Sequence, residues 1–185
     1  IATVEETFEM ISQGTTVGVF QVESPGMQQM LRGMRPWKYE HIIAAVSLYR
    51  PGPMEYIPEF NARMHGEKDV HYHHEALESI LSETYGIITY QEQILQIAGE
   101  LFSYPMSEAD LMRRAVSKKK EKELVLHREL FLERGPQNGI PEETAGKIFD
   151  DIEYFANYGF NKSHAADYAM ITVQTAFLKT HYPEE

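Results

Sequence analysis

The feature that most constrains the fold is a succession of helical patterns that proline and glycine interrupt at short intervals. Ser24 can cap a helix that runs to about Arg32. Pro36 fits the first turn of the next helix, which has to end before Pro51 because a proline disfavours helical backbone in the residue before it. The pattern predicts a mainly α protein, an irregular multi-helix domain.

The second half of the chain continues the pattern. Gln91 opens a helix, Ser107 with Asp110 resembles a capping box, and Pro141 starts a helix that carries an apolar stripe. The expected helices cover about residues 75–81, 91–101 and 119–133, one starts at Ser107 and carries residues 111–114, one runs from Pro141 until residues 157–159 end it, and the last runs from a cap at Asn161 or Ser163 to about residue 180. We expect the charged helix 119–133 to stop at Gly135-Pro136.

Two short segments favour strands instead. Residues 17–22 alternate loosely, and residues 86–90 form a β-branched and aromatic run. We therefore expect one or two very short strands within the helical fold.

The chain of 185 residues has the length of one domain, which can divide into two helical subdomains. It starts with Ile1 rather than methionine, and we interpret it as a fragment of a larger protein. No apolar run approaches the length of a membrane helix, and cysteine is absent, so we expect no membrane association and a cytoplasmic location.

Charge is distributed unevenly. The net charge is −11, which argues against a protein that grips nucleic acid with its whole surface. Residues 113–134 nevertheless carry eight basic and four acidic side chains. A local basic region lies in an otherwise acidic chain.

The centre of this basic region contains five cations in eight residues: Arg113, Arg114, Lys118, Lys119 and Lys120. Arginine binds phosphate oxygens as a bidentate fork, and lysine binds them as a point charge. The alternative is a solvated helix end, where cations complement the helix dipole.

A second cationic segment runs from Tyr158 to His164. A helix that starts at Asn161 or Ser163 presents free backbone N–H groups beside Lys162 and His164, which suits an anion, and neighbouring aromatic rings suit a base. The alternative is structural, with Phe160 packing and Asn161 or Ser163 serving only as a cap.

Two other polar clusters give weaker indications of a functional site. We reject a zinc site at His71, His73 and His74, because the second histidine of the helical zinc motif is absent. Around Gln91, side chains can orient a ligand or only satisfy the backbone. The chain has no phosphate-binding loop, dinucleotide fingerprint, nucleophile elbow or pair of neighbouring strand aspartates, so we expect no catalysis by this chain alone.

Five motifs, in the same order, resemble the alpha subunit of bacterial DNA polymerase III. They lie at residues 18–24, 50–53, 84–93, 109–120 and 158–164, and the resemblance extends from about Thr16 to Pro183. Two departures are Ser117, where the family often has glycine, and Asp167, where a small residue is common.

The resemblance implies that residues 1–185 form the fingers domain of a DNA-directed DNA polymerase, with residues 1–16 continuing from the palm. Such a domain closes over the incoming deoxynucleoside triphosphate (dNTP) and the nascent base pair. Mg²⁺ is expected in the parent enzyme, held by palm aspartates outside this chain and by the dNTP, and this chain is expected to bind none. The implied partners are primer–template DNA, the dNTP and other subunits of the polymerase III holoenzyme.

The resemblance and the charge pattern together give a set of candidate site residues. We expect arginine, lysine and helix N-terminal groups from separate helices to converge on the triphosphate, and aromatic rings to stack on the base pair. The phosphate-binding candidates are Arg50, Arg113, Arg114, Lys118, Lys119, Asn161, Lys162, Ser163 and His164, the stacking candidates are Tyr158 and Phe160, and the supporting candidates are Tyr90, Gln91 and Gln93. Two alternatives remain, namely a non-catalytic nucleic-acid-binding module and a helical protein-interaction module.

Overall fold

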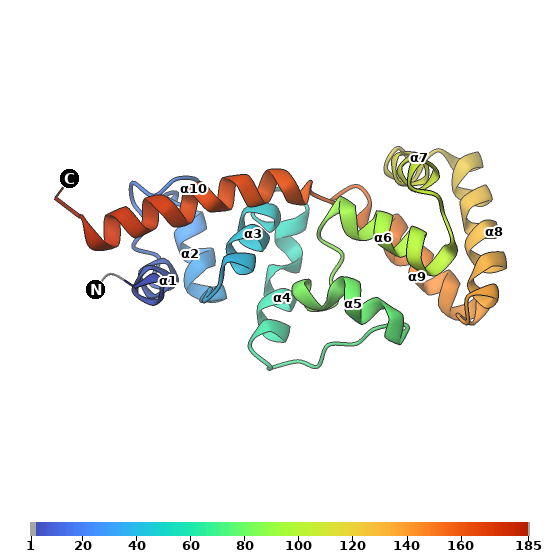
Figure 1. Ribbon diagram of the computed structural model, residues 1–185, viewed down its shortest axis with the longest axis horizontal. Helices are drawn as coiled ribbons and strands as arrows, with labels where there is room; N and C mark the ends of the chain where they lie inside the picture. Colours follow the sequence, from blue (N-terminus) through green and yellow to red (C-terminus); the bar gives the residue numbers. More distant parts are fainter. Residues whose placement is uncertain (1–2, 185) are drawn as a thin grey trace. The chain divides into compact units, whose positions relative to one another are not determined.

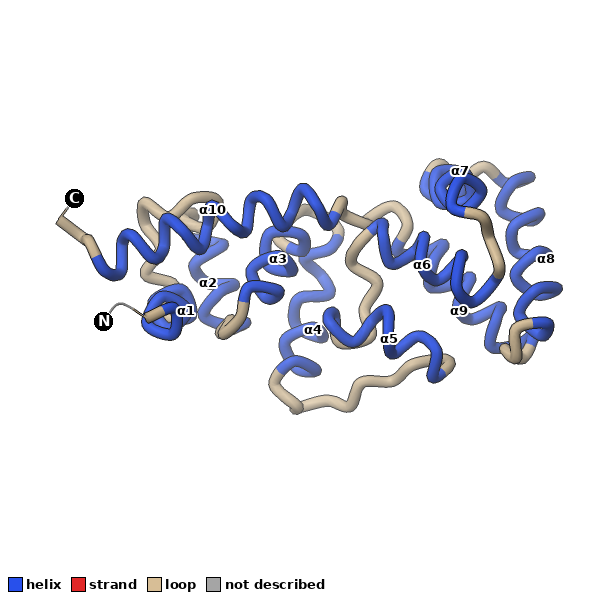
Figure 2. Tube along the Cα trace, viewed as in Figure 1, coloured by secondary structure: helices blue, strands red, loops and turns tan. Residues whose placement is uncertain are grey.

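A computed structural model describes residues 3–184, which form ten α-helices and three short 3₁₀ helices (Figure 1). The mainly α prediction is confirmed. Within these residues the only β pairing is an isolated parallel bridge between Tyr90 and Phe160, and Figure 2 accordingly shows helix and loop alone. No helix in this part of the chain is long and apolar enough to cross a bilayer.

The chain divides into two compact units. Unit 1 combines residues 1–65 with residues 162–185, and unit 2 is residues 66–161. That the whole chain acts as one domain, and that residues 1–16 continue from a palm, remain predictions.

Unit 1 is organised around its last helix, which lies along α3 and contacts α1 (Figure 1). The small buried residues Ala165, Ala169 and Ala176 let these helices approach closely. The Tyr39 hydroxyl donates a hydrogen bond to the carbonyl of Ala166. The helices of unit 1 are α1 (Val4–Ser12), α2 (Pro25–Met34), α3 (Tyr39–Leu48), η1 (Pro53–Tyr56), α4 (Ile57–Met64) and α10 (Lys162–His181).

Unit 2 packs around an aromatic core. The rings of Phe102 and Phe131 stack with centroids 3.8 Å apart, and Phe149 meets Phe131 edge-on at 5.1 Å. These rings come from three helices and join them into one core. The helices of unit 2 are η2 (Glu75–Leu77), α5 (Glu78–Leu81), η3 (Ser82–Thr84), α6 (Gln91–Phe102), α7 (Met106–Ser117), α8 (Glu121–Gln137) and α9 (Glu142–Phe155).

The strand predictions were wrong. Residues 17–22 form consecutive turns, in which Gln21 has a φ of 66° and the amide of Phe20 donates to the Thr175 hydroxyl of α10 at 3.1 Å. Residues 86–89 form no ladder, because the backbone N–H of Thr89 is taken by a side chain described below. In both segments, the backbone groups are satisfied by turns, side chains and single contacts rather than by the ladder of a neighbouring strand.

Several helix starts and ends also differ from the prediction. Arg35 ends α2 in a left-handed conformation (φ 50°), so Pro36 precedes α3 instead of starting it. Ser107 is no cap, since α7 starts at Met106 with Pro105 before it. Helix α8 continues through Pro136 to Gln137, because a proline in the last turn removes only one helical hydrogen bond and Gly135 packs closely against Ala145.

Candidate functional site

The start of α6 is built on the buried amide of Gln93. Its side-chain oxygen accepts hydrogen bonds from the backbone N–H groups of Thr89 (2.9 Å) and Tyr90 (3.0 Å). Its nitrogen donates to the Thr84 hydroxyl at 2.8 Å. A single side chain thus satisfies two backbone donors at the helix start, as a helix N-terminus requires.

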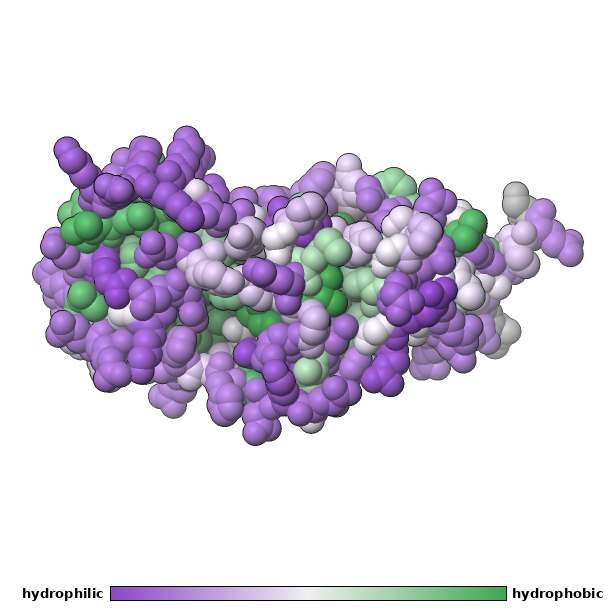
Figure 3. Space-filling model, turned by 180° about the vertical axis from the view of Figure 1, so that it is seen from behind, coloured by the Kyte–Doolittle hydropathy of each residue, from purple (hydrophilic) through white to green (hydrophobic). Residues whose placement is uncertain are grey.

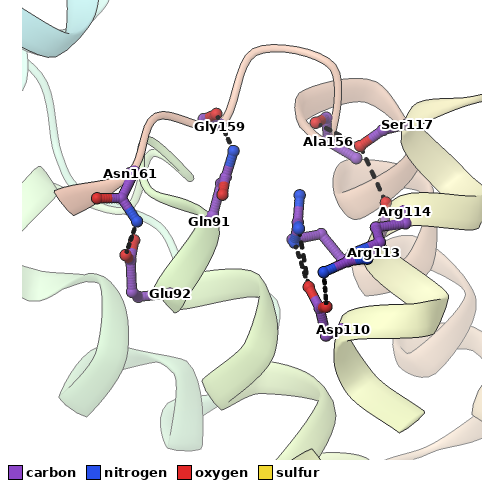
Figure 4. Close-up of polar contacts among 9 residues, drawn as sticks. All are labelled: Gln91, Glu92, Asp110, Arg113, Arg114, Ser117, Ala156, Gly159 and Asn161. Atoms are coloured by element: carbon purple, nitrogen blue, oxygen red, sulfur yellow. Dashed lines mark hydrogen bonds and ion pairs between the residues drawn. The ribbon is translucent and has the colours of Figure 1, made fainter. Parts of the chain in front are cut away.

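The segment Gly159–Asn161 is held against this helix start. The backbone N–H of Gln91 donates to the carbonyl of Phe160 (2.9 Å), and the N–H of Phe160 donates to the carbonyl of Thr89 (3.0 Å). Side chains extend the contact, since Gln91 donates to the Gly159 carbonyl at 3.2 Å and Asn161 donates to Glu92 at 3.0 Å (Figure 4).

This contact leaves little room for a side chain at position 159. A Cβ on Gly159 would lie 3.3 Å from Cγ of Gln91 and 3.5 Å from its backbone nitrogen. The structure therefore brings together four candidates from two distant segments, Tyr90 and Gln91 with Phe160 and Asn161. Tyr158 lines a surface hollow together with another candidate, Lys119. The side chain of Tyr90 is buried, so it packs inside the domain and is not available on its surface.

The two consecutive arginines of α7 meet on one carboxylate, Asp110 (Figure 4). Arg113 donates to Oδ1 from Nε (3.1 Å) and Nη2 (2.8 Å), and Arg114 lies 2.7 Å from Oδ2. The side chain of Arg113 is 15% exposed and that of Arg114 is 62% exposed. Neighbouring helical residues normally diverge, and here a shared anion draws the two guanidinium groups together.

The arginines also change the acidity of Asp110. Its pKa is lowered below the ordinary value, chiefly by the hydrogen bond from Arg113 and further by the charges of both arginines. The two arginines therefore favour the ionised form of the carboxylate that they share. Asp110 was missing from the candidates, although its spacing of three and four residues from the arginines is typical of helical ion pairs.

The lysines that follow lie at the C-terminal end of α7. Lys119 has a φ of 49°, its N–H donates to the carbonyl of Val116, and the N–H of Lys120 donates to the carbonyl of Ala115. This is the Schellman pattern of helix termination, in which a left-handed residue is usually glycine. Lys118 and Lys119 are exposed there and complement the helix dipole, which agrees with the structural alternative.

Ser117 ties this helix end to α9. Its hydroxyl lies 2.9 Å from the carbonyl of Arg113 and 2.8 Å from the carbonyl of Ala156 (Figure 4). A glycine at this position has no hydroxyl to make this link. The serine therefore connects the arginine-bearing helix to the residues just before Tyr158.

The remaining candidates belong to unit 1. Lys162, Ser163 and His164 form the first turn of α10, and Ser163 and His164 are exposed there. Arg50 follows α3, its Nε donates to the carbonyl of Ser47 at 2.9 Å, and burial lowers its pKa. We predicted that these groups bind one nucleotide together with Arg113 and Arg114 of unit 2. This stays a prediction.

Residues 3–184 contain no group of three or more histidine, aspartate or glutamate side chains arranged to hold a metal ion. His73 lies 3.0 Å from Asp151, and His74 accepts the N–H of Ala76 at the start of η2. Both histidines thus have structural roles in unit 2.

Comparison with known families accounts for the order of the motifs. Residues 2–139 match the family described as the bacterial DNA polymerase III alpha subunit finger domain. The chain belongs to this family. The match contains the arginine pair of α7 and the start of α6.

The curated proteins that are similar to this chain are named DNA polymerase III subunit alpha. The chain is 54% identical over 185 residues to the DNA polymerase III subunit alpha of Thermus aquaticus, which covers 97% of the chain. It is 51% identical to the subunits of Chlamydia trachomatis (98% of the chain) and Bacillus subtilis (97%). The chain spans only 15 to 16% of the length of these relatives, so it corresponds to a part of such a subunit.

Proposed function

We propose that this finger domain binds the triphosphate of an incoming dNTP and holds the nascent base pair during template-directed DNA synthesis. The polymerase is the bacterial DNA polymerase III alpha subunit, a DNA-directed DNA polymerase. The observation that carries the proposal is the pair of guanidinium groups from Arg113 and Arg114 gathered on Asp110.

The electrostatic argument starts from the ligand. A nucleoside triphosphate carries about four negative charges, and stabilisation of the charge on the leaving pyrophosphate is the main task in phosphoryl transfer. Two arginines already directed at one carboxylate can exchange its oxygens for phosphate oxygens with little rearrangement. Arg114, with the more exposed side chain, is the more accessible of the two to a ligand.

The other candidates take roles around this pair. Lys118 and Lys119 add positive charge at the end of α7, and Arg50, Asn161, Lys162, Ser163 and His164 contribute a second anion contact. Tyr158 and Phe160 stack on the base pair. Tyr90, Gln91 and Gln93 hold their segment in position through the hydrogen bonds described above.

The proposed reaction uses Mg²⁺, which we propose is bound outside this chain. We assign the metal ions to palm aspartates elsewhere in the subunit and to the dNTP itself. Primer–template DNA, the other holoenzyme subunits and a cytoplasmic location complete the proposal.

The test is steady-state kinetics of the intact alpha subunit with Arg113→Ala and Arg114→Ala. Each variant should raise the KM for dNTP or lower kcat by tenfold or more, which corresponds to about 1.4 kcal/mol. Arg113→Lys keeps the charge but loses the fork, so it should recover only part of the activity. Arg63→Ala is the matched control, because Arg63 also pairs with a helical carboxylate, Glu59, at 2.9 Å. Unchanged kinetics for both α7 variants would remove the arginines from the site.

A further inference from the structure

The loop that joins α2 to α3, residues 34–38, is held in place by side chains from two helices of unit 1. The carbonyl of Pro36, a buried residue, accepts a hydrogen bond from the Ser12 hydroxyl of α1 at 2.7 Å. The backbone N–H of Trp37 donates to Nδ1 of His41 in α3 at 3.4 Å. Because these contacts fix the backbone of the loop, the side chains that it presents to solvent start from a defined position.

Arg35, in the middle of this loop, combines a left-handed backbone with a held guanidinium group. Its φ is 50°, a conformation that favours glycine, and its N–H donates to the carbonyl of Leu31 at 2.7 Å. Its Nη2 donates to Nδ1 of His65 at 3.1 Å, and Nε2 of the same ring donates to the carbonyl of Met34 at 2.8 Å. The imidazole thus orients the guanidinium group without supplying a negative charge. Strained backbone at non-glycine residues is concentrated at functional sites.

Trp37, two residues further on, presents its ring to solvent. The residue is 54% exposed, and its ring meets that of His41 edge-on with centroids 4.2 Å apart. Hydrophilic side chains predominate on the face of the molecule that Figure 3 draws, and an indole ring normally stabilises a fold by being buried. Packing within unit 1 therefore does not account for the exposure of this ring.

Three exposed cationic side chains accompany the ring. Within residues 3–184 none of them forms an ion pair with a carboxylate. Residues 32–40 carry only one carboxylate, that of Glu40, so this segment is positively charged in a chain whose net charge is −11. We call the ring and the three cations the Trp37 patch, which consists of Arg32, Arg35, Trp37 and Lys38.

We propose that the Trp37 patch binds an unpaired stretch of the DNA template strand. The indole ring stacks on one base, and Arg35 and Lys38 pair with the phosphates beside that base. This inference rests on the proposed function, since a template is present only in a working polymerase. It goes beyond that function, because no residue of the patch is among those that we assign to the dNTP or the nascent base pair.

The combination of groups decides between DNA and other polyanions. Cations alone would suit an acidic peptide equally well. A nucleotide places a flat base beside each phosphate, and every base offers a face to an aromatic ring. In a duplex, neighbouring base pairs cover these faces, so the single strand is the form on which the ring of Trp37 can stack.

The test is fluorescence anisotropy of a labelled oligothymidylate of about 12 nucleotides, titrated with the intact alpha subunit in the absence of dNTP. Trp37→Ala should weaken binding about fivefold or more, which is the effect of losing one base–aromatic stack. Trp37→Tyr keeps a ring and should recover most of the affinity. Tyr182→Ala is the matched control and should have no effect, because Tyr182 is an aromatic residue of similar exposure, 51%, just after α10.

The salt dependence of the same titration tests the phosphate contacts. For a single strand, the slope of log affinity against log salt concentration changes by about 0.7 per phosphate contact. Arg35→Gly suits the left-handed backbone and removes the guanidinium group, and Lys38→Gln removes an ammonium group, so each should reduce the slope by about 0.7. Trp37→Ala should leave the slope unchanged. Lys147→Gln, an equal charge change on an exposed side chain of α9, is the control and should also leave it unchanged.

Three results would overturn the proposal. They are unchanged affinity in all variants of the patch, an equal loss of affinity for a blunt duplex of the same length, and displacement of the oligonucleotide by polyglutamate as readily as by unlabelled single-stranded DNA. The last result would identify an acidic protein segment as the ligand. Because the titration contains no dNTP, its outcome is independent of the kinetic test of Arg113 and Arg114, and either proposal can fail without the other.

Discussion

Replacing Gln93 by leucine tests whether one buried amide holds the start of α6 and, through it, the segment Gly159–Asn161. The side-chain oxygen of Gln93 is the acceptor for the N–H groups of Thr89 and Tyr90, at 2.9 and 3.0 Å. Gln93 is 1% exposed, so water cannot take over its role in the variant.

The expected loss of stability follows from the number of backbone N–H groups that lose their acceptor. Each buried backbone donor left without an acceptor costs about 1–3 kcal/mol. Two such donors predict a loss of roughly 4 kcal/mol in the free energy of unfolding. The Thr84 hydroxyl adds little, since it retains the Leu81 carbonyl at 3.3 Å.

Urea denaturation followed by circular dichroism measures this loss, and Gln91→Leu is the matched control. Gln91 is half-buried and makes one side-chain bond, to the Gly159 carbonyl at 3.2 Å, so its loss should cost less than about 1 kcal/mol. Fluorescence of Trp37, the single tryptophan, follows unit 1 in the same samples. A Gln93→Leu effect no larger than that of Gln91→Leu would refute the reasoning.

Three more predictions concern other parts of the fold. Asp110→Asn should lower the free energy of unfolding by less than about 1 kcal/mol, as is usual for a surface ion pair, and a larger loss would contradict this prediction. Because the variant weakens the acceptor of the Arg113 Nε–H group, NMR should show faster exchange of that proton with water. Gly26→Ala places a Cβ against the Tyr49 hydroxyl, which ends a half-buried side chain that can move aside, so we expect the free energy of unfolding to fall by less than about 1 kcal/mol and Tyr49→Phe to recover this loss; a larger fall would contradict the expectation. Burial lowers the pKa of His41 to about 4, so between pH 6.5 and 4 the unfolded chain binds more protons than the folded chain. As the pH falls through this window, the free energy of unfolding should fall by up to roughly 3 kcal/mol. Urea unfolding of His41→Asn should depend less on pH, and an unchanged pH dependence would contradict the prediction.

Local sequence signals located most helices because caps act over a few residues. Ser24 caps α2 by accepting the N–H of Met27, and α6 and α9 start directly after Tyr90 and Pro141, as predicted. The signals failed where a distant partner intervened. Residues 17–22 are held by α10, and α8 continues through Pro136 where Gly135 packs on α9.

For the candidate site, the sequence indicated the residue types but not their grouping. The cation cluster and the segment 158–164 were visible as motifs, and the family comparison agrees with the resemblance that they support. Asp110 and the link made by Ser117 emerged only from geometry, since they depend on where side chains end after the helices have packed.

The amino-acid sequence alone thus determined that the chain is helical, where most helices start, and which family it belongs to, because caps, prolines and motif order are properties of neighbouring residues. Only the tertiary structure decided that residues 162–185 join the first 65 residues in one unit, that Phe160 pairs with Tyr90, and that two arginines share one carboxylate. These depend on contacts between segments far apart in the chain, whose free energy comes from packing and burial rather than from local propensity.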